Sequence, residues 1–272
     1  QTTEDFMTFK LGLIGAGAIG ADVIDLVARE HSGEIEIPAV LVRQPREPDG
    51  NGPNFTNDPE AFFSHQYDAV LEGAGHSAII AHGARVLNAG SDLIVTSVGA
   101  FTDQAVYDGC LEAAQANGTR MLIASAGIGS LDILSGAAVG GLDEVVMTVR
   151  KDPSAWFGTV AEDQYDLANM TEPTVIFEGS PRAGAASYPQ NVNISAAVSL
   201  AGAGLDRTKL IIVADPTIDT HVIEIVAKGA FGQYSFVENV AVSETNRKTG
   251  KIVAMAVMKT VRNLISPVVV GV

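Results

Sequence analysis

The feature that most constrains the fold is a glycine triplet between an apolar run and an amphipathic segment. Residues 10–14 form a short apolar run that predicts a buried strand, and Gly15-Ala-Gly17-Ala-Ile-Gly20 follows it directly. Apolar residues then recur at helical spacing: Ile19, Val23, Leu26 and Val27. A glycine triplet between a strand and a helix predicts a dinucleotide-binding turn.

Each glycine has its own role in such a turn. Gly15 permits the tight turn, Gly17 lets a pyrophosphate approach the backbone, and Gly20 lets the helix pack closely on the strand. The start of the helix offers N–H groups and a positive dipole end to the phosphates. The cofactor contacts predicted here are Gly15, Gly17, Ala18, Ile19 and Gly20. The alternative is a glycine-rich turn that binds no ligand.

The end of the second predicted strand bears on the choice of cofactor. In NAD-preferring folds an acidic residue usually closes this strand and binds the ribose hydroxyls. Here the strand at 35–42 ends in Arg43-Gln44-Pro45-Arg46. Because an arginine attracts a 2′-phosphate that an acid would repel, we expect NADP, or the use of both NADP and NAD. The alternative is that Arg43 is a solvated loop cation.

Strands and helices continue to alternate up to residue 124. Strands are predicted at 67–72, 92–96 and 120–124, with helices at 76–89 and 103–116 between them. This alternation predicts an α/β fold with a Rossmann-type doubly wound parallel sheet, in which ligands bind at the carboxyl ends of the strands. Further cofactor contacts are therefore predicted at Gly73, Ala74, Ser97, Val98 and Gly99. His76 either competes for a catalytic role or lines the cleft and caps the next helix.

The pattern changes after residue 129. Strand-like runs at 144–150, 174–177, 209–214, 221–228 and 234–242 have few helices between them. They predict a second α/β domain with a more open mixed sheet, which has one face for helices and one for a partner or substrate. A helical pattern at 248–264 is expected to pack back on the first domain. The predicted domains are 9–127 with 243–272, for dinucleotide binding, and 128–242, for catalysis and dimerisation.

Charge and cysteine content exclude some classes of partner and compartment. The formal net charge of −15 argues against nucleic acid and anionic membranes as main partners. A single cysteine, Cys110, cannot form an intramolecular disulfide, which fits a reducing, cytoplasmic compartment. The histidines and the cysteine show no metal-ligand spacing, and no stretch reaches the length of a membrane span. Residues 1–8 are expected to form a frayed terminus.

Several motifs together resemble the L-aspartate dehydrogenase family over about residues 11–272. Besides the glycine triplet, they are Ser97-Val-Gly-Ala100, Leu131-Asp132, Arg150-Lys151 near Pro153, Tyr188-Pro-Gln-Asn191-Val-Asn193, Leu200-Ala-Gly-Ala-Gly204, Ala214-Asp-Pro216 with His221-Val-Ile223, and Glu238-Asn239 before Glu244-Thr-Asn246. The resemblance implies a homodimer that uses NAD or NADP. It also implies interconversion of L-aspartate with iminosuccinate and with oxaloacetate plus ammonia.

The resemblance also assigns residues. It implies that His221 is catalytic, that Asn191 binds cofactor, and that a cofactor contact falls at Ala126 and Gly127. The sequence departs from the family pattern at three places. Ser125-Ala-Gly127 exchanges the Ala and Gly of the usual turn, Arg182-Ala-Gly184 replaces Arg-Glu-Ala, and Lys151-Asp-Pro153 replaces Lys-Pro-Pro.

The implied reaction needs a base, because the ammonium group must lose a proton before hydride leaves the α-carbon. An imidazole has an unperturbed pKa of roughly 6.5 and suits this role, which we assign to His221. The strand pattern alone favours a packed residue, because His221 lies on the same strand face as Ile223 and Ile225, and it is the resemblance that favours catalysis.

Predicted substrate contacts are Arg150, Lys151 and Asn193, with Arg182 as a further candidate for a substrate carboxylate. Alternatively, the cations are surface or structural charges, and Asn193 caps a helix. Two rival functions stay open, a reductase of another small amino or imino carboxylate and a non-catalytic NADP-binding regulator.

Overall fold

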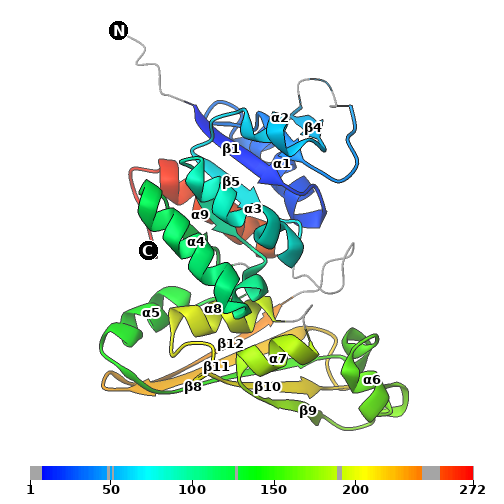
Figure 1. The fold of residues 1–272 in the computed structure, drawn as a ribbon. Helices are drawn as coiled ribbons and strands as arrows, with labels where there is room; N and C mark the ends of the chain where they lie inside the picture. Colours follow the sequence, from blue (N-terminus) through cyan, green and yellow to red (C-terminus); the bar gives the residue numbers. More distant parts are fainter. Residues whose placement is uncertain are drawn as a thin grey trace. The chain divides into compact units, whose positions relative to one another are not determined.

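The computed structural model describes residues 8–47, 50, 52–125, 128–188, 192–240 and 252–271 (Figure 1). The chain forms two compact units. The first unit comprises residues 1–124 and 254–269, and the second unit comprises residues 125–253 and 270–272. The first boundary between the units, at residues 124 and 125, lies close to the boundary predicted at 127. The second lies further along the chain than the one predicted at 242, and residues 241–251 fall outside the described ranges.

The first unit contains a parallel sheet. Its strands are β1 (Phe9–Ile14), β2 (Ile35–Glu36), β3 (Ala39–Leu41), β4 (Asn54–Thr56), β5 (Ala69–Glu72), β6 (Asp92–Val95) and β7 (Met121–Ile123). Their order is β4-β3-β1-β5-β6-β7, with β2 paired to β1, and every pairing is parallel. The predicted doubly wound sheet is confirmed. The order reverses between β1 and β5, which makes the carboxyl ends of these two strands the expected place for a ligand.

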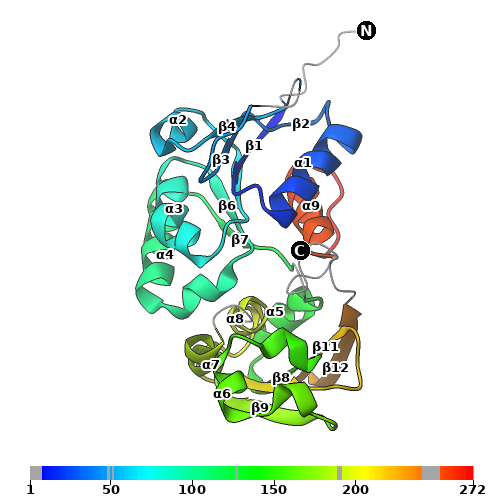
Figure 2. The same ribbon diagram turned by 90° about the vertical axis from the view of Figure 1, so that its right-hand side faces the viewer.

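Helices cover both faces of this sheet. They are α1 (Ala18–Glu30), α2 (Pro59–Phe63), α3 (His76–Asn88), the 3₁₀ turn η1 (Val98–Thr102), α4 (Gln104–Asn117) and α9 (Ile252–Ile265). In Figure 2, α1 and α9 lie on one face, whereas α3 and α4 lie on the other. Burial from both sides explains why β1 is apolar at consecutive positions, with Leu13 and Ile14, which point to opposite faces, both buried.

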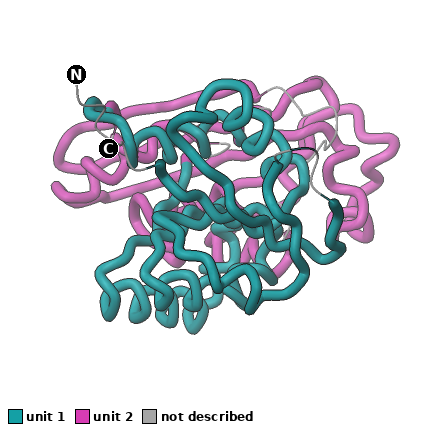
Figure 3. The backbone as a smooth tube through the Cα atoms, turned by 90° about the horizontal axis from the view of Figure 1, so that it is seen from above, with its two compact units in different colours: residues 1–124, 254–269 teal, residues 125–253, 270–272 magenta. Residues whose placement is uncertain are grey.

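Helix α9 returns the chain to the first unit. Four of its residues, Ala254, Val257, Met258 and Val261, belong to the same buried cluster as Leu11, Val23 and Ile94. Figure 3 shows residues 254–269 in the same colour as residues 1–124. The chain therefore passes between the units twice, as the apolar spacing at 248–264 predicted.

The second unit is built on a mixed five-stranded sheet. Its strands are β8 (Leu142–Lys151), β9 (Thr174–Gly179), β10 (Lys209–Ala214), β11 (His221–Gly229) and β12 (Gly232–Val240), in the order β12-β11-β8-β10-β9. Strands β8 and β10 are parallel, and the other neighbours are antiparallel. The predicted open mixed sheet is confirmed.

One face of this sheet carries helices. The helical segments are α5 (Leu131–Val139), η2 (Pro153–Trp156), α6 (Val160–Gln164), η3 (Leu167–Asn169), α7 (Pro181–Ser187) and α8 (Asn193–Ala201). Helices α5, α7 and α8 lie on the same side of the sheet (Figure 1). In β11 burial alternates with a period of two: Ile223 and Ile225 are buried, whereas Val222 and Val226 on the opposite face are partly exposed. Only side chains on the same face of the sheet as His221, Ile223 and Ile225 can share a site with His221.

Candidate functional site

A cavity of about 720 Å³ lies in the first unit at the carboxyl ends of β1, β3 and β5. Five predicted cofactor contacts line it: Gly15, Gly17, Arg43, Gly73 and Ala74. Ala18, Ile19 and Gly20 form the first turn of α1, directly after the lining residue Gly17. The switch point of the strand order and the glycine turn therefore meet at one cavity.

The three glycines of the turn differ in what surrounds them. Gly15 has a φ of +101°, and a Cβ there would lie 2.8 Å from the Cβ of Ala74. A Cβ on Gly20 would lie 2.3 Å from the carbonyl oxygen of Gly15. A Cβ on Gly17 would meet nothing within 4 Å, so this position faces open space. The first two glycines are required by the fold, whereas Gly17 leaves room for a ligand.

The start of α1 suits an anionic ligand. Its N-cap residue Gly17 makes no side-chain capping bond, and the first turn contains no acidic residue. The positive end of the helix dipole and the first N–H groups therefore lack a compensating protein charge. With the open space at Gly17, these residues fit a dinucleotide whose pyrophosphate lies at this helix end.

Positively charged side chains line the cavity near the carboxyl end of β3. Arg43, Gln44 and Arg46 line it, and the guanidinium of Arg46 lies 4.1 Å from the centroid of the Phe55 ring. Phe55 belongs to β4 and is buried, so it provides a fixed platform for Arg46. The sequence analysis placed Arg46 in the loop but assigned it no role. Only the pairing of β4 with β3 brings it to the cavity.

Sequence reasoning missed one wall of the cavity. It is the face of α3 formed by Ser77, Ala78, Ala81 and His82, joined by Asn57 and Pro59. Burial, and next the positive charge of Arg85, lowers the pKa of the His82 imidazole below its usual value. Small residues at helical spacing indicate that another group can approach this helix closely. The sequence does not say which face of the helix lines the cavity.

Besides Ala18, Ile19 and Gly20, three further predicted contacts in the described part of the first unit lie outside the cavity lining. Ser97, Val98 and Gly99 are buried where β6 turns into η1. The Ser97 hydroxyl donates a 2.8 Å hydrogen bond to Glu72. His76 is the first residue of α3, after the N-cap residue Gly75. The predicted contacts Ala126, Gly127 and Asn191 lie outside the described residues.

In the second unit, His221 and Lys151 lie on one face of the sheet. Val222 of β11 pairs with Arg150 of β8 in antiparallel register. The next residues, His221 and Lys151, are therefore opposite each other on the other face, where they are 7% and 5% exposed. The Lys151 ammonium lies 5.4 Å from the centroid of the Trp156 ring. An imidazole and a buried ammonium side by side can bind and protonate an anionic substrate.

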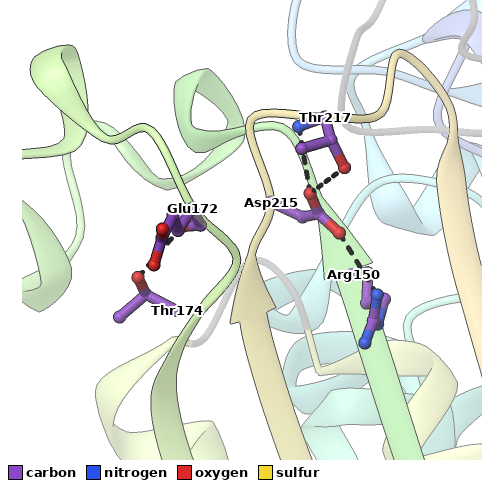
Figure 4. A network of polar contacts seen from close by, with 5 residues as sticks. All are labelled: Arg150, Glu172, Thr174, Asp215 and Thr217. Carbon is purple, nitrogen blue, oxygen red and sulfur yellow. Dashed lines mark hydrogen bonds and ion pairs between the residues drawn. The ribbon is translucent and has the colours of Figure 1, made fainter.

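Arg150 points to the opposite face and forms an ion pair with Asp215, which is 1% exposed, at 3.2 Å (Figure 4). Thr217 donates its backbone N–H and its hydroxyl to the same carboxylate, at 3.0 and 2.6 Å. Burial raises the pKa of Asp215, but the bonds from Thr217 and the charge of Arg150 outweigh it, so this pKa lies below its usual value. The network holds the loop that leads into His221.

The predicted substrate contacts Asn193 and Arg182 lie on helices of the second unit. Asn193 is the first residue of α8, and the N-cap residue of this helix is Val192, so Asn193 is not the capping residue that the alternative interpretation expected. Arg182 forms a bidentate ion pair with Asp206, at 2.7 and 3.0 Å. Of the cations predicted for the substrate carboxylates, Lys151 is the one that shares a face with His221.

The described residues offer neither a metal-binding cluster nor a helix able to span a membrane. No group of three or more His, Cys, Asp or Glu side chains among them could hold a metal ion. Within the same ranges, every helix is too short or too polar to cross a membrane.

Comparison with known proteins matches both units. A family model described as aspartate dehydrogenase, C-terminal, matches residues 132–264, and one described as homoserine dehydrogenase, NAD binding domain, matches residues 15–124. The L-aspartate dehydrogenase of Ralstonia pickettii (strain 12J) is 35% identical over 257 residues, covering 93% of this chain and 96% of the relative. That of Pseudomonas aeruginosa is 36% identical over 257 residues, covering 92% and 96%.

Solved structures share the fold. Aspartate dehydrogenase from Thermotoga maritima aligns with a TM-score of 0.75 at 22% identity, covering 97% of this chain and 99% of that one. A hyperthermophilic archaeal homoserine dehydrogenase in complex with NADPH aligns with a TM-score of 0.62 at 10% identity, covering 96% and 99%.

Proposed function

The chain belongs to the L-aspartate dehydrogenase family, and from this premise we propose that it is an NAD(P)-dependent L-aspartate dehydrogenase. It oxidises L-aspartate to iminosuccinate, which water converts to oxaloacetate and ammonia, or it catalyses the reverse reaction. The proposal rests chiefly on the glycine-lined cavity at the switch point of the first sheet. The first unit binds the cofactor, and the second unit supplies the acid/base group.

His221 acts as the base. The bound nicotinamide supplies the hydride acceptor for the α-carbon of the substrate. His221 first takes a proton from the substrate ammonium, which leaves a neutral amine that can release hydride. The imidazole releases this proton to solvent, and it then takes a proton from the water that attacks the imine carbon. It returns that second proton to the nitrogen, which leaves as ammonia while the new hydroxyl loses its proton to form the keto group. General acid/base catalysis of this kind contributes about 10²–10⁴-fold in rate.

Lys151 binds a substrate carboxylate. Its ammonium is buried on the same face as His221, and a buried cation gains most from an anionic partner. Asn193, at the start of α8, orients the substrate by donating its amide N–H groups. Arg150 remains a predicted substrate contact, but its ion pair with Asp215 supports a role in holding the loop before His221.

NADP is the preferred cofactor in this proposal. Arg43 and Arg46 line the same end of the cavity, and two guanidinium groups suit the two negative charges of a 2′-phosphate. Replacing both by alanine should weaken NADPH binding far more than NADH binding. Equal losses for both cofactors would refute the preference.

We propose a homodimer formed through the open face of the second sheet. The apolar residues on this face include Val222, Val226 and Val237, and Val237 is exposed. Thr148, Arg150 and Glu224 lie among these valines, and the ion pairs Lys228–Glu144 and Lys209–Glu178 lie nearby, so the face mixes apolar and charged groups as the interfaces of many protein complexes do. Light scattering should report a dimer, and Val237→Glu should report a monomer. A monomeric wild-type protein would refute this assembly.

A cytoplasmic location accompanies the proposal. The one cysteine of the chain, Cys110, is a buried free thiol in α4, as expected for a protein of a reducing compartment.

The activity is tested by mixing the protein with L-aspartate and NADP⁺ or NAD⁺ at alkaline pH and following reduced nicotinamide by absorbance. We expect turnover with L-aspartate, and a His221→Ala variant that binds cofactor normally but loses about 10²-fold or more in kcat. The matched control is His65→Ala, which removes an exposed histidine of the first unit. Turnover on another amino or hydroxy acid but not on L-aspartate would refute the substrate, and full activity of His221→Ala would refute the base.

A further inference from the structure

Glu72 is a carboxylate with no exposed surface at the carboxyl end of β5. Acidic side chains are rarely buried completely unless they are paired. This carboxylate accepts hydrogen bonds from backbone N–H groups and from a serine hydroxyl. Its burial therefore depends on how the surrounding backbone is arranged.

Four donors converge on this side chain. The backbone N–H groups of Ala74 and Gly75 each donate to Oε1 at 2.8 Å. The Ser97 hydroxyl donates to Oε1 at 2.8 Å, and the Ser97 backbone N–H donates to Oε2 at 3.0 Å. Hydrogen bonds to a charged acceptor are roughly twice as strong as those between neutral groups. Glu72 thus joins two loops that are far apart in the sequence.

Both loops lie at the edge of the sheet where the cofactor cavity is. Gly73 and Ala74 line the cavity, and the Ala74 Cβ lies where a side chain on Gly15 would collide. The position of Ala74 therefore limits the position of the first glycine of the turn. Ser97 begins the segment in which cofactor contacts were predicted at Ser97, Val98 and Gly99.

The charge of Glu72 also distinguishes two helix ends. Its carboxylate accepts the N–H of Gly75, the N-cap residue of α3, and so compensates the positive end of that helix. The first turns of α1 and α3 alike have neither a capping side chain nor an acidic residue, so the Glu72 carboxylate at Gly75 is what distinguishes α3. A pyrophosphate at this edge is therefore attracted to α1 rather than to α3.

We propose that Glu72 is a positioning residue for cofactor binding. It holds the 73–75 loop and the Ser97 turn in the binding arrangement before the cofactor arrives, and it directs the pyrophosphate to α1. This role rests on the proposed function, since it presumes that a nicotinamide dinucleotide binds in the cavity.

The test compares Glu72→Gln with the matched control Asp92→Asn. The Asp92 carboxylate also accepts a backbone N–H, from Arg120, but Asp92 begins β6 at the opposite edge of the sheet. Each variant replaces a loop-holding carboxylate by an amide. Cofactor Kd is measured by titration with NADPH and NADH, following nicotinamide fluorescence, and stability is measured by thermal unfolding. Steady-state kinetics give the cofactor KM and kcat.

Glu72→Gln should raise the cofactor Kd and KM by about tenfold or more. The glutamine NH₂ group would face one of the N–H or O–H donors that now bind the carboxylate, and two donors cannot form a hydrogen bond with each other. At saturating cofactor, kcat should fall much less than KM rises. Asp92→Asn should leave the Kd within about twofold of the wild-type value, even where it lowers the melting temperature.

An unchanged Kd in Glu72→Gln, or equal changes in both variants, would overturn the proposal. If the wild-type protein binds neither cofactor, the proposed function itself fails, and this role fails with it. If Glu72→Gln does not fold, hydrogen exchange on the cofactor-free wild-type protein decides. Protected amides at Ala74, Gly75 and Ser97 support the role, and rapid exchange at these amides overturns it.

Discussion

Replacing Gly17 by aspartate should separate cofactor binding from folding. A side chain at Gly17 meets no atom within 4 Å, and the residue has extended backbone angles at the N-cap of α1. Aspartate is among the best N-cap residues, so the free energy of unfolding should change by less than about 0.5 kcal/mol. The new carboxylate lies where the pyrophosphate is expected.

The loss of affinity follows from the repulsion between the two anions. Two unit charges 4 Å apart repel by about 1 kcal/mol in water and by about 4 kcal/mol at the effective dielectric constant near a protein surface. These limits correspond to about fivefold and about a thousandfold in Kd. Because the cavity is partly open, we expect an increase of about 30-fold, which should shrink at high salt.

Two control variants test whether the loss of affinity comes from the local charge at position 17, from the added volume, or from the change in net charge of the protein. Gly17→Asn adds nearly the same volume without the charge and should cost less affinity than Gly17→Asp. Gly33→Asp adds the same charge at another glycine with no atom within 4 Å, outside the cavity lining, and should bind normally. Affinity is measured by fluorescence titration with NADPH, and folding by circular dichroism during heating. A Gly17→Asp protein that binds within about threefold of the wild type, or a Gly33→Asp protein that loses as much affinity, would refute the reasoning.

Three further predictions concern folding, substrate and pH. Gly20→Ala should lower the free energy of unfolding by about 1–3 kcal/mol, because its Cβ would lie 2.3 Å from the Gly15 carbonyl oxygen; an unchanged urea midpoint would contradict this. Lys151→Met keeps the apolar volume but removes the charge, so the KM for L-aspartate should rise by about tenfold or more while cofactor Kd stays constant; a KM equal to that of the wild type counts against the assignment. The pKa of Asp215 is lowered in the folded protein, so its carboxylate stabilises the fold above the ordinary aspartate pKa of about 3.9 and loses this effect as the pH falls through the folded value. Asp215→Asn should therefore be less stable than the wild type at neutral pH, and the difference should narrow in acid; a gap that widens on acidification would be inconsistent with the lowered pKa.

Much of the first unit could be predicted because its signals are local. The turn after β1 follows from the conformation of Gly15 and from the close approach at Gly20, both of which lie within a few residues of the strand. The alternation of strands and helices then leaves few topologies, because crossover connections are right-handed. The rule that ligands bind at the carboxyl ends of parallel strands located the loops after β5 and β6. It did not predict that the Ser97 hydroxyl donates a hydrogen bond to Glu72.

The lining of the cavity was only partly predictable. Arg46 and His82 reach it through the pairing of β3 with β4 and through the face that α3 turns to the cavity. Both depend on packing between segments that are separate in the sequence, so neither has a local signal.

The sequence by itself determined the nucleotide turn, the parallel sheet, and the fact that neighbouring strand residues such as Arg150 and Lys151 point to opposite faces. It could not determine which of the two shares a face with His221. That depends on the register between β8 and β11, which places Lys151 opposite His221 and leaves Arg150 for Asp215. Strand register is a property of non-local hydrogen bonds and buried faces, and a shift of one residue would exchange the two cations. The tertiary structure therefore decided which cation accompanies the proposed base.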